Sequence, residues 1–230
     1  MFTALQHKRY KAAKNLIAKQ PKSSYTKVTT MKSEGIMMII RPYTDTDEQG
    51  WLRCRVLAFL NTAYFDNVLQ KKAHYDRPSI ELVAIEQNKV VGLIDIEYEE
   101  TPRTICTAYN TVGGMIWHVA VHPDYQHRRI GEKLLEAALK EAKTAKLTYL
   151  EAWTRDNPPI PRWYEKMRFT QKYAYHHLYF DETALEKYDL SVPAQVHPMT
   201  MFAHYTGSDP DVLNRASRRH LCMCYVKRII

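Results

Sequence analysis

The sequence predicts an α/β (α+β) protein built on one mixed sheet with helices packed against it. Two apolar runs on either side of Gln87-Asn88-Lys89 indicate an antiparallel hairpin. Further along, a strand, an amphipathic helix at 131–143 and a second strand follow one another, and such a β-α-β unit joins parallel strands. A last alternating run at 220–228 indicates one more strand. Antiparallel and parallel connections together predict a mixed sheet.

The spacing of apolar residues and the positions of helix- and strand-breaking residues predict each helix and strand. The helix at 131–143 is the clearest, because its apolar face recurs at helical spacing in Leu134, Leu135, Ala138 and Ala142. Pro123 ends the strand before it, since proline cannot donate to a ladder. Strands are expected at 37–41, 80–85, 90–98, 115–121, 147–153, 169–180 and 220–228, and helices at 45–59, 62–72, 131–143 and 162–167. The region 181–219 is mixed in pattern.

Length and composition exclude several classes of protein. The 230 residues suit one domain with extensions, and 45% hydrophobic residues can fill a core. No apolar run approaches the ~20 residues that span a bilayer, so no membrane partner is expected. The four cysteines follow no secretory signal, which favours reduced thiols and a cytoplasmic location. Cys222 and Cys224 lack a second ligand pair and are interpreted as core residues, with no metal.

The net charge of +8 belongs almost wholly to the N-terminal segment. Residues 1–36 hold eight lysines and arginines against one acid, so the remaining chain carries only +1. This distribution predicts a solvated, disordered basic extension and no nucleic-acid partner for the body of the protein. The alternatives are an arm that touches membrane or RNA, an organelle transit peptide, or a translation start at Met37 or Met38.

The basic turn before the helix at 131–143 predicts an anion site. The first amides of a helix have no intrahelical partner, and the helix dipole is positive there. A strand that runs directly into such an end commonly holds phosphate. Arg128 and Arg129 add charge, and Gly131 permits close backbone approach. The alternative is an exposed helix start with solvated arginines. The spaced glycines of a Walker loop or a dinucleotide fingerprint are absent.

The wider pattern resembles the GNAT superfamily of N-acyltransferases. The family's acyl-CoA motif, Q/R-x-x-G-x-G/A, is matched by "QHRRIG" from Gln126 to Gly131. Its second motif, an Asn followed seven residues later by a Tyr, is matched by Asn157 and Tyr164. The resemblance implies a GNAT-type fold, with a mostly antiparallel central sheet in which two parallel strands splay apart between flanking helices.

The resemblance also implies a division of the chain. An N-acetyltransferase domain is expected at 37–180, after the basic extension at 1–36. A C-terminal extension at 181–230 is expected to complete the sheet with the final strand.

Acetyl-CoA is the co-substrate that the resemblance implies. Its pantetheine arm would pair with the backbone of Val119, Ala120 and Val121 in the gap between the splayed strands. Asn157 would orient the cofactor or hold its loop. The pyrophosphate would lie in the turn formed by Gln126, His127, Arg128, Arg129, Ile130, Gly131 and Glu132.

Two arginines depart from the family pattern. Arg129 stands where the first motif has its first glycine, and Arg168 stands where the second motif has the glycine of "GF". A positive φ at Arg129 would cost ~1 kcal/mol or more. The favoured alternative is a slightly different loop backbone, with the Arg129 guanidinium on a CoA phosphate.

The implied reaction is direct attack of a primary amine on the thioester, without a covalent enzyme intermediate. Tyr164 matches the family's proton donor, and Glu151 matches a general-base position used by some relatives. Glu97, Glu99 and His118 are rival bases. Each of the two also has a structural alternative. Tyr164 would be a core aromatic residue whose hydroxyl finds a hydrogen-bond partner, and Glu151 would be an ordinary solvated strand residue.

The acceptor is not identified by any motif. A small-molecule or peptide amine is expected, and whether the chain forms a homodimer is left open. Aromatic residues after the first strand either shape an acceptor pocket or fill the core: Trp51, Phe59, Tyr64, Phe65 and Tyr75. The competing interpretation is a non-catalytic acyl-CoA-binding or sensor protein on the same fold.

Overall fold

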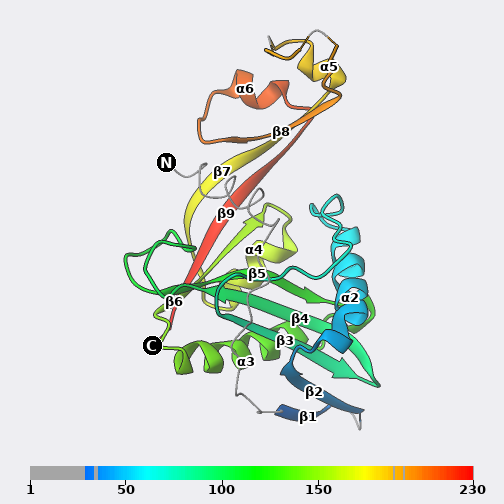
Figure 1. The fold of residues 1–230 in the computed structure, drawn as a ribbon, viewed down its shortest axis with the longest axis vertical. Coiled ribbons are helices and arrows are strands. Elements are labelled where there is room, and N and C mark those ends of the chain that lie inside the picture. Colours follow the sequence, from blue (N-terminus) through cyan, green and yellow to red (C-terminus); the bar gives the residue numbers. More distant parts are fainter. Residues whose placement is uncertain (1–28, 34–35, 189, 194, 230) are drawn as a thin grey trace. The chain divides into compact units, whose positions relative to one another are not determined.

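The computed structural model describes residues 29–33, 36–188, 190–193 and 195–229. Within them the chain forms two compact units (Figure 1). The larger unit holds residues 29–175 and 220–229, and the smaller holds 176–219. Most of the predicted basic extension, residues 1–28, lies outside the described residues.

A twisted sheet forms the centre of the larger unit, in the order β1-β2-β3-β4-β5-β6-β9. Two helices of full length flank it, and a shorter one follows β6. The strands are β1 (Thr29–Ser33), β2 (Ile36–Pro42), β3 (Ser79–Glu86), β4 (Lys89–Tyr98), β5 (Gly113–Val121), β6 (Tyr149–Arg155) and β9 (Arg218–Arg228). The helices are η1 (Asp45–Asp47), α2 (Glu48–Leu60), η2 (Pro123–Tyr125), α3 (Ile130–Thr144) and α4 (Pro159–Lys166).

The sheet is mixed and mostly antiparallel. β5 and β6 pair in parallel, as the β-α-β pattern predicts. The neighbouring pairs from β1 to β5, and β6 with β9, are antiparallel. The predicted fold class is therefore confirmed. The hairpin between β3 and β4 turns at Gln87 and Asn88, whose φ angles of 49° and 60° are those of a two-residue turn that matches the strand twist.

Two layers of helix cover the sheet. The apolar face predicted for α3 is buried, and it packs on alternate residues of the strands, such as Ile94, Ile96 and Ile116. The opposite face carries α2, whose Trp51 and Cys54 pack on Leu93 and other residues that point the other way. The period of two in the strands thus separates an α3 face from an α2 face.

The smaller unit contains β8 (Thr200–Tyr205) and the short helices α5 (Glu182–Leu185) and α6 (Pro210–Arg215). β7 (Thr170–Asp181) enters it from the larger unit and pairs antiparallel with β8. Its own core contains Leu178, Phe180 and Leu185. These elements occupy the region for which the sequence indicated no clear pattern. The division at 180 and 181 stays a prediction.

Two local expectations differ from the structure. Residues 62–72 form turns and irregular chain where a second helix was predicted. Asn61, Asp66 and Asn67 favour turns over helix. In addition, β1 lies within the segment expected to be disordered, and it pairs with β2. An edge strand needs mainly backbone partners, so its polar composition concealed it.

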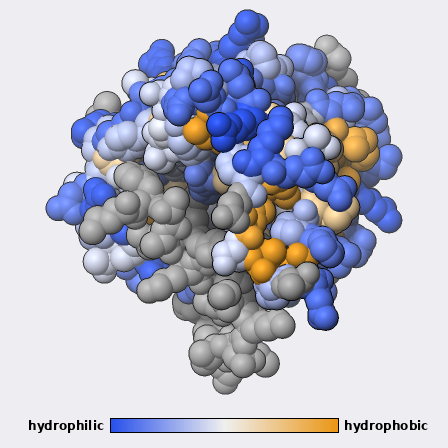
Figure 2. Space-filling model, turned by 90° about the horizontal axis from the view of Figure 1, so that it is seen from above, coloured by the Kyte–Doolittle hydropathy of each residue, from blue (hydrophilic) through white to orange (hydrophobic). Residues whose placement is uncertain are grey.

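The surface in Figure 2 is mostly hydrophilic, with apolar side chains gathered in small patches. In the larger unit the most exposed large apolar residues follow one another near the end of α2, at Leu57, Leu60, Phe65 and Val68. None of the helices in the described part of the chain is long and apolar enough to cross a membrane.

Candidate active site

The parallel strands β5 and β6 separate along their length. Their pairing covers only Gly113 to Ile116 on β5 and Tyr149 to Ala152 on β6. β5 continues to Val121 and β6 to Arg155, each held by its other neighbour. Past the last pair, the facing backbone edges of β5 and β6 no longer bond to each other. This is the splayed pair that the sequence predicted by resemblance.

A bulge accompanies the separation. The β4–β5 register shifts between Asp95 and Ile96, so Trp117 is the extra residue on β5. Bulges bend a strand and raise its twist. The bulge at Trp117 directly follows Ile116, the last residue of β5 that pairs with β6, so it marks the point where the strands separate.

The edge of β5 that faces the opening belongs to Val119 and Val121. The amide of His122 donates to the carbonyl of Val91 on β4. Backbone groups alternate in direction along a strand, so those of Val119 and Val121 point away from β4 and toward the opening. The Gln126 Nε2 group donates to the Val121 carbonyl at 3.2 Å. Gln126 thus joins the end of β5 to the turn that follows, and Ala120 points its side chain into the α2-face core.

The turn after β5 delivers the chain directly into α3. Arg129 is the N-cap, and its carbonyl accepts the first helical hydrogen bond from Lys133 at 3.1 Å. The amides of Ile130, Gly131 and Glu132 precede that bond, so they point out of the helix end. Ile130 is buried beneath the turn and fixes it to the core. The turn can therefore present three amides and a positive dipole to an anion.

Arg129 adopts the left-handed conformation, with φ 60° and ψ 19°. The expectation of a different loop backbone is therefore wrong: arginine takes the conformation that glycine favours. His127 and Arg168 also have positive φ, at 61° and 62°. Both positions where family glycines are replaced are thus left-handed arginines. The surrounding structure holds each at a cost of roughly 1 kcal/mol.

The two arginines of the turn behave differently. Arg128 forms a bidentate ion pair with Glu86 of β3, at 3.0 and 2.7 Å. Glu86 is almost fully buried, whereas Arg129 is exposed. Arg128 therefore anchors the turn to the sheet, and Arg129 is the exposed cation beside the helix end.

The structure brings the two sequence motifs together. A Cβ placed on Gly131 would lie 3.5 Å from Trp163 of α4 and 3.6 Å from Val121 of β5. The backbone carbonyl of Asn157 accepts a hydrogen bond from the Ile160 amide at 2.9 Å, which holds the start of α4. The turn, the open strand edge and α4 thus surround one location.

Tyr164 lies on α4 within the core. Its ring stacks on Tyr225 at 5.4 Å and meets Phe169 edge-on at 5.1 Å. Burial raises the pKa of its phenol, and the nearby Tyr64 hydroxyl raises it further. Among the described residues, none exchanges a hydrogen bond with the Tyr164 hydroxyl. The phenol is therefore protonated at neutral pH and has a donor available.

Glu151 is fully buried on β6, and both of its oxygens are occupied. Oε2 accepts from the amides of Thr107 and Ala108, each at 2.8 Å. Oε1 accepts from the Thr107 hydroxyl at 2.7 Å and from Trp153 Nε1 at 2.9 Å. This arrangement ties the loop between β4 and β5 to β6.

Glu99 performs the same task at the other end of that loop. Its Oε2 accepts from the amides of Thr104, Ile105 and Cys106 at 3.0 to 3.1 Å. Its Oε1 accepts from the Gly113 amide at 3.2 Å. Two buried carboxylates therefore shape the loop at 100–112.

The other rival bases differ in their surroundings. Glu97 is 5% exposed and accepts from Trp117 Nε1, at the bulge, at 2.9 Å. His118 accepts at Nδ1 from Arg55 Nε at 3.4 Å. Burial, with Arg55 and Lys72 nearby, lowers the pKa of His118 to about 3. His118 is therefore neutral at physiological pH and a weak base.

A buried ion network adjoins His118 on the α2 face. Lys72 lies 3.0 Å from Asp95 and also contacts Glu81. The Tyr75 hydroxyl donates to Asp95 at 3.1 Å. Burial raises the pKa of Asp95 to about 6, although the charge of Lys72 opposes that rise.

Sequence reasoning missed the residues that hold the irregular segment 61–68. Arg55 donates to the carbonyl and to the side chain of Asn67, at 2.8 and 3.1 Å. The Tyr64 hydroxyl accepts from the Arg155 amide of β6 at 2.8 Å. Because Arg55 also bonds His118 of β5, this segment is tied to both separated strands. The partners are distant in sequence and form no motif, so spacing could not reveal them.

The sheet, with parallel strands that part beside a helix start, has the arrangement that the resemblance to the acyltransferase family predicted. Residues 78–171 match the family model described as an acetyltransferase (GNAT) domain. This part of the chain is therefore a GNAT acetyltransferase domain, which confirms the family and the enzyme class expected from the sequence. No curated protein sequence matches the chain.

Three solved structures illustrate the likeness. The ribosomal-protein-S18-alanine N-acetyltransferase from Escherichia coli has a TM-score of 0.51 at 13% identity, covering 84% of this chain and 94% of that one. A GNAT-family acetyltransferase from Streptococcus pneumoniae has a TM-score of 0.52 at 14% identity, covering 84% and 99%. Arabidopsis thaliana NAA60, in complex with a bisubstrate analogue, has a TM-score of 0.51 at 13% identity, covering 83% and 97%. At such identities the likeness shows a shared fold.

Proposed function

We propose that the protein transfers an acetyl group from acetyl-CoA to a primary amine by direct attack in a ternary complex. The observation that carries this proposal is the separation of β5 and β6 beside the start of α3. The open edge offers backbone donors and acceptors for an amide-bearing arm, and the helix start offers amides for a pyrophosphate. The acceptor, a small-molecule or peptide amine, would approach from the α2 face.

In this proposal acetyl-CoA lies along the backbone of Val119 to Val121. The turn from Gln126 to Glu132 surrounds the pyrophosphate, mainly through backbone amides. Among the side chains, Arg129 is the exposed cation, since Arg128 is engaged with Glu86.

Tyr164 is proposed as the donor to the departing thiolate. Two observations support this role. Tyr164 follows Trp163 on α4, and Trp163 lies close to Gly131 at the turn. The Tyr164 hydroxyl has no hydrogen-bond partner among the described residues. The raised pKa keeps the proton on the phenol, so it can donate a hydrogen bond as charge develops on sulfur.

The predicted general base, Glu151, stays a prediction. Its four hydrogen bonds support a structural role in holding the loop at Thr107 and Ala108. Glu97, beside the bulge at Trp117, is the rival base that adjoins the separation of the strands. An amine that arrives neutral would need no enzyme base beyond water.

A test combines a thiol-release screen of acetyl-CoA against an amine panel with Tyr164→Phe. Tyr164→Phe should lower kcat by roughly tenfold or more while leaving the Kd for CoA unchanged. The matched control is Tyr175→Phe, a partly buried tyrosine of the same unit outside the two motifs. An unchanged kcat in the Tyr164 variant would contradict its proposed role.

A non-catalytic acyl-CoA-binding protein is the second candidate. It is favoured by the full engagement of Glu99 and Glu151 and by the low pKa of His118, which leave few free bases. It predicts a thermal shift with CoA and no thiol release with any amine. Absence of both signals would overturn both candidates.

A further inference from the structure

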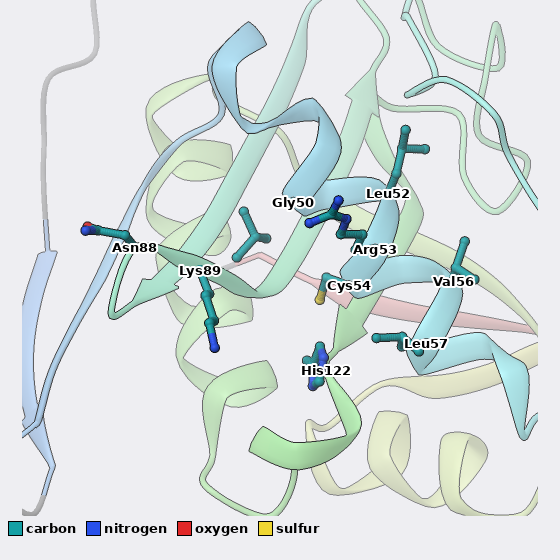
Figure 3. A pocket seen from close by; sticks show the side chains of 10 residues that line it. Gly50, Leu52, Arg53, Cys54, Val56, Leu57, Asn88, Lys89 and His122 are labelled. Carbon is teal, nitrogen blue, oxygen red and sulfur yellow. The ribbon is translucent and has the colours of Figure 1, made fainter.

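A groove lies on the α2 face, apart from the site described above. It has a volume of about 640 Å³. We call it the α2 groove and define it by Gly50, Arg53, Cys54 and Leu57 of α2, Lys89 of β4, and His122 (Figure 3). Its volume is within the roughly 300 to 1,000 Å³ of sites for small organic ligands.

The sequence of α2 builds one wall of this groove. Gly50, Arg53, Cys54 and Leu57 are spaced at i, i+3, i+4 and i+7, so they share one helical face. A Cβ on Gly50 would come within 2.6 Å of Val90 Cγ2. Glycine therefore lets the start of the helix lie close to β4, while the chain beyond it stands further away and leaves a hollow.

The floor and the rim differ in chemistry. The floor consists of Cys54, Val90 and Leu57, whose side chains are all apolar. Cys54 and Val90 are buried, and Leu57 is 40% exposed. Arg53 extends from α2 and Lys89 from β4 around the same opening, with His122 beside them (Figure 3). Neither Arg53 nor Lys89 forms a hydrogen bond or ion pair with a side chain in the described part of the chain. No acidic residue lines the groove.

The α2 groove is distinct from the proposed acetyl-CoA site. It contains no residue of β6, α3 or α4. The two sites meet at the end of β5, where His122 follows Val121 and where Ala120 packs in the same cluster as Cys54 and Val90. A ligand of the groove would therefore bind without displacing acetyl-CoA.

We propose that the α2 groove binds a small amphipathic carboxylate. The apolar body would cover Cys54, Leu57 and Val90, and the carboxylate would lie between Arg53 and Lys89. Two cations in a groove that no acidic residue lines favour an anionic head, and the apolar floor selects against a bare inorganic ion. This inference is independent of the proposed transferase activity.

The test is an NMR titration of the full chain with octanoate, at pH 7 and saturating CoA. The amides of Gly50, Cys54 and Val90 should shift, with a Kd of about 1 mM or tighter. Octanol, which has the same chain length and no charge, should bind at least roughly fivefold more weakly.

Two variants test separately the contacts of the octanoate carboxylate and those of its apolar chain. The double variant Arg53→Gln, Lys89→Gln should weaken octanoate binding by roughly fivefold or more and leave octanol unchanged. Leu57→Glu places a carboxylate in the floor without touching the core and should abolish octanoate binding. The matched control, Lys140→Gln with Lys143→Gln, removes two exposed charges from α3 and should have no effect.

Three results would overturn the proposal. They are the absence of shifts at the three amides, equal binding of octanol and octanoate, and insensitivity to both variants. If a parallel titration without CoA gives shifts only in the turn before α3, and saturating CoA removes them, octanoate binds in the cofactor site and the proposal is also overturned.

Discussion

The turn before α3, with the end of β5, and the loop between β4 and β5 are built in opposite ways. The first is one stretch of chain, from Val119 to Glu132, and it offers mostly backbone groups. The second is held by buried side chains, such as Glu99 and Glu151, whose partners come from other segments. Backbone presented by a strand and a helix start can be anticipated from local sequence. Buried contacts between distant segments cannot.

The comparison also separates two uses of charge. At the turn, the Arg129 side chain is exposed, whereas the Arg128 side chain forms an ion pair with Glu86. Beside the 100–112 loop, the buried carboxylates of Glu99 and Glu151 each accept several hydrogen bonds, most of them from backbone amides of that loop. The first region thus includes an exposed charge with room for a ligand, and the second includes buried charges that hold the loop in place. Substitutions in each region should therefore affect different properties: stability for the buried carboxylates and CoA affinity for the turn.

Glu151→Ala should lower the free energy of unfolding by about 4 kcal/mol, because it strips four hydrogen bonds from buried or partly buried donors. Urea denaturation measures this, with the exposed Glu136→Ala as control. If stability is unchanged and only kcat falls, Glu151 is a base and the architectural interpretation fails.

Asp95→Asn should alter the pH dependence of stability. The folded pKa of about 6 lies above the ordinary value of 3.8, so the folded protein keeps a proton that the unfolded chain releases. The stabilising contribution is therefore full below about pH 4 and is lost as the pH rises through 6.

The difference in unfolding free energy between wild type and Asp95→Asn should thus decline by an amount on the order of 2 kcal/mol between pH 4 and 6. Denaturation at several pH values measures it. A flat difference would mean that Lys72 holds Asp95 ionised throughout.

Gly131→Ala should separate binding from folding. An added Cβ meets Trp163 at an ordinary 3.5 Å, so stability should not fall. The methyl group would nevertheless stand where a pyrophosphate approaches the helix amides, and the Kd for CoA should rise roughly tenfold. Calorimetry with CoA checks this. Unchanged affinity would place the pyrophosphate elsewhere.

Arg129→Gly should raise the free energy of unfolding by about 1 kcal/mol, because it relieves the left-handed conformation. Arg128→Gly is the contrasting control, since it breaks the pair with Glu86 and should destabilise. Equal effects of the two substitutions would contradict the division of roles within the turn.

Much of the fold follows from local pattern. The α3 helix was predictable because its apolar residues recur on one face, and that face is the one buried. The hairpin between β3 and β4 was predictable from turn residues between apolar runs. The segment at 62–72 was not, because contacts of Arg55 and of β6 with Asn67 and Tyr64 override its helical composition.

The strands β2 to β6, the helix α3, the acetyltransferase motifs and the location of the turn could be predicted from sequence, since each depends on neighbours in the chain. The folded structure was needed to show that β5 and β6 part after four residue pairs, and that Arg129 is left-handed. It also decided that Glu151 is enclosed by a loop more than 40 residues away. Burial and pairing depend on segments that meet only in the folded chain, and no local pattern records them.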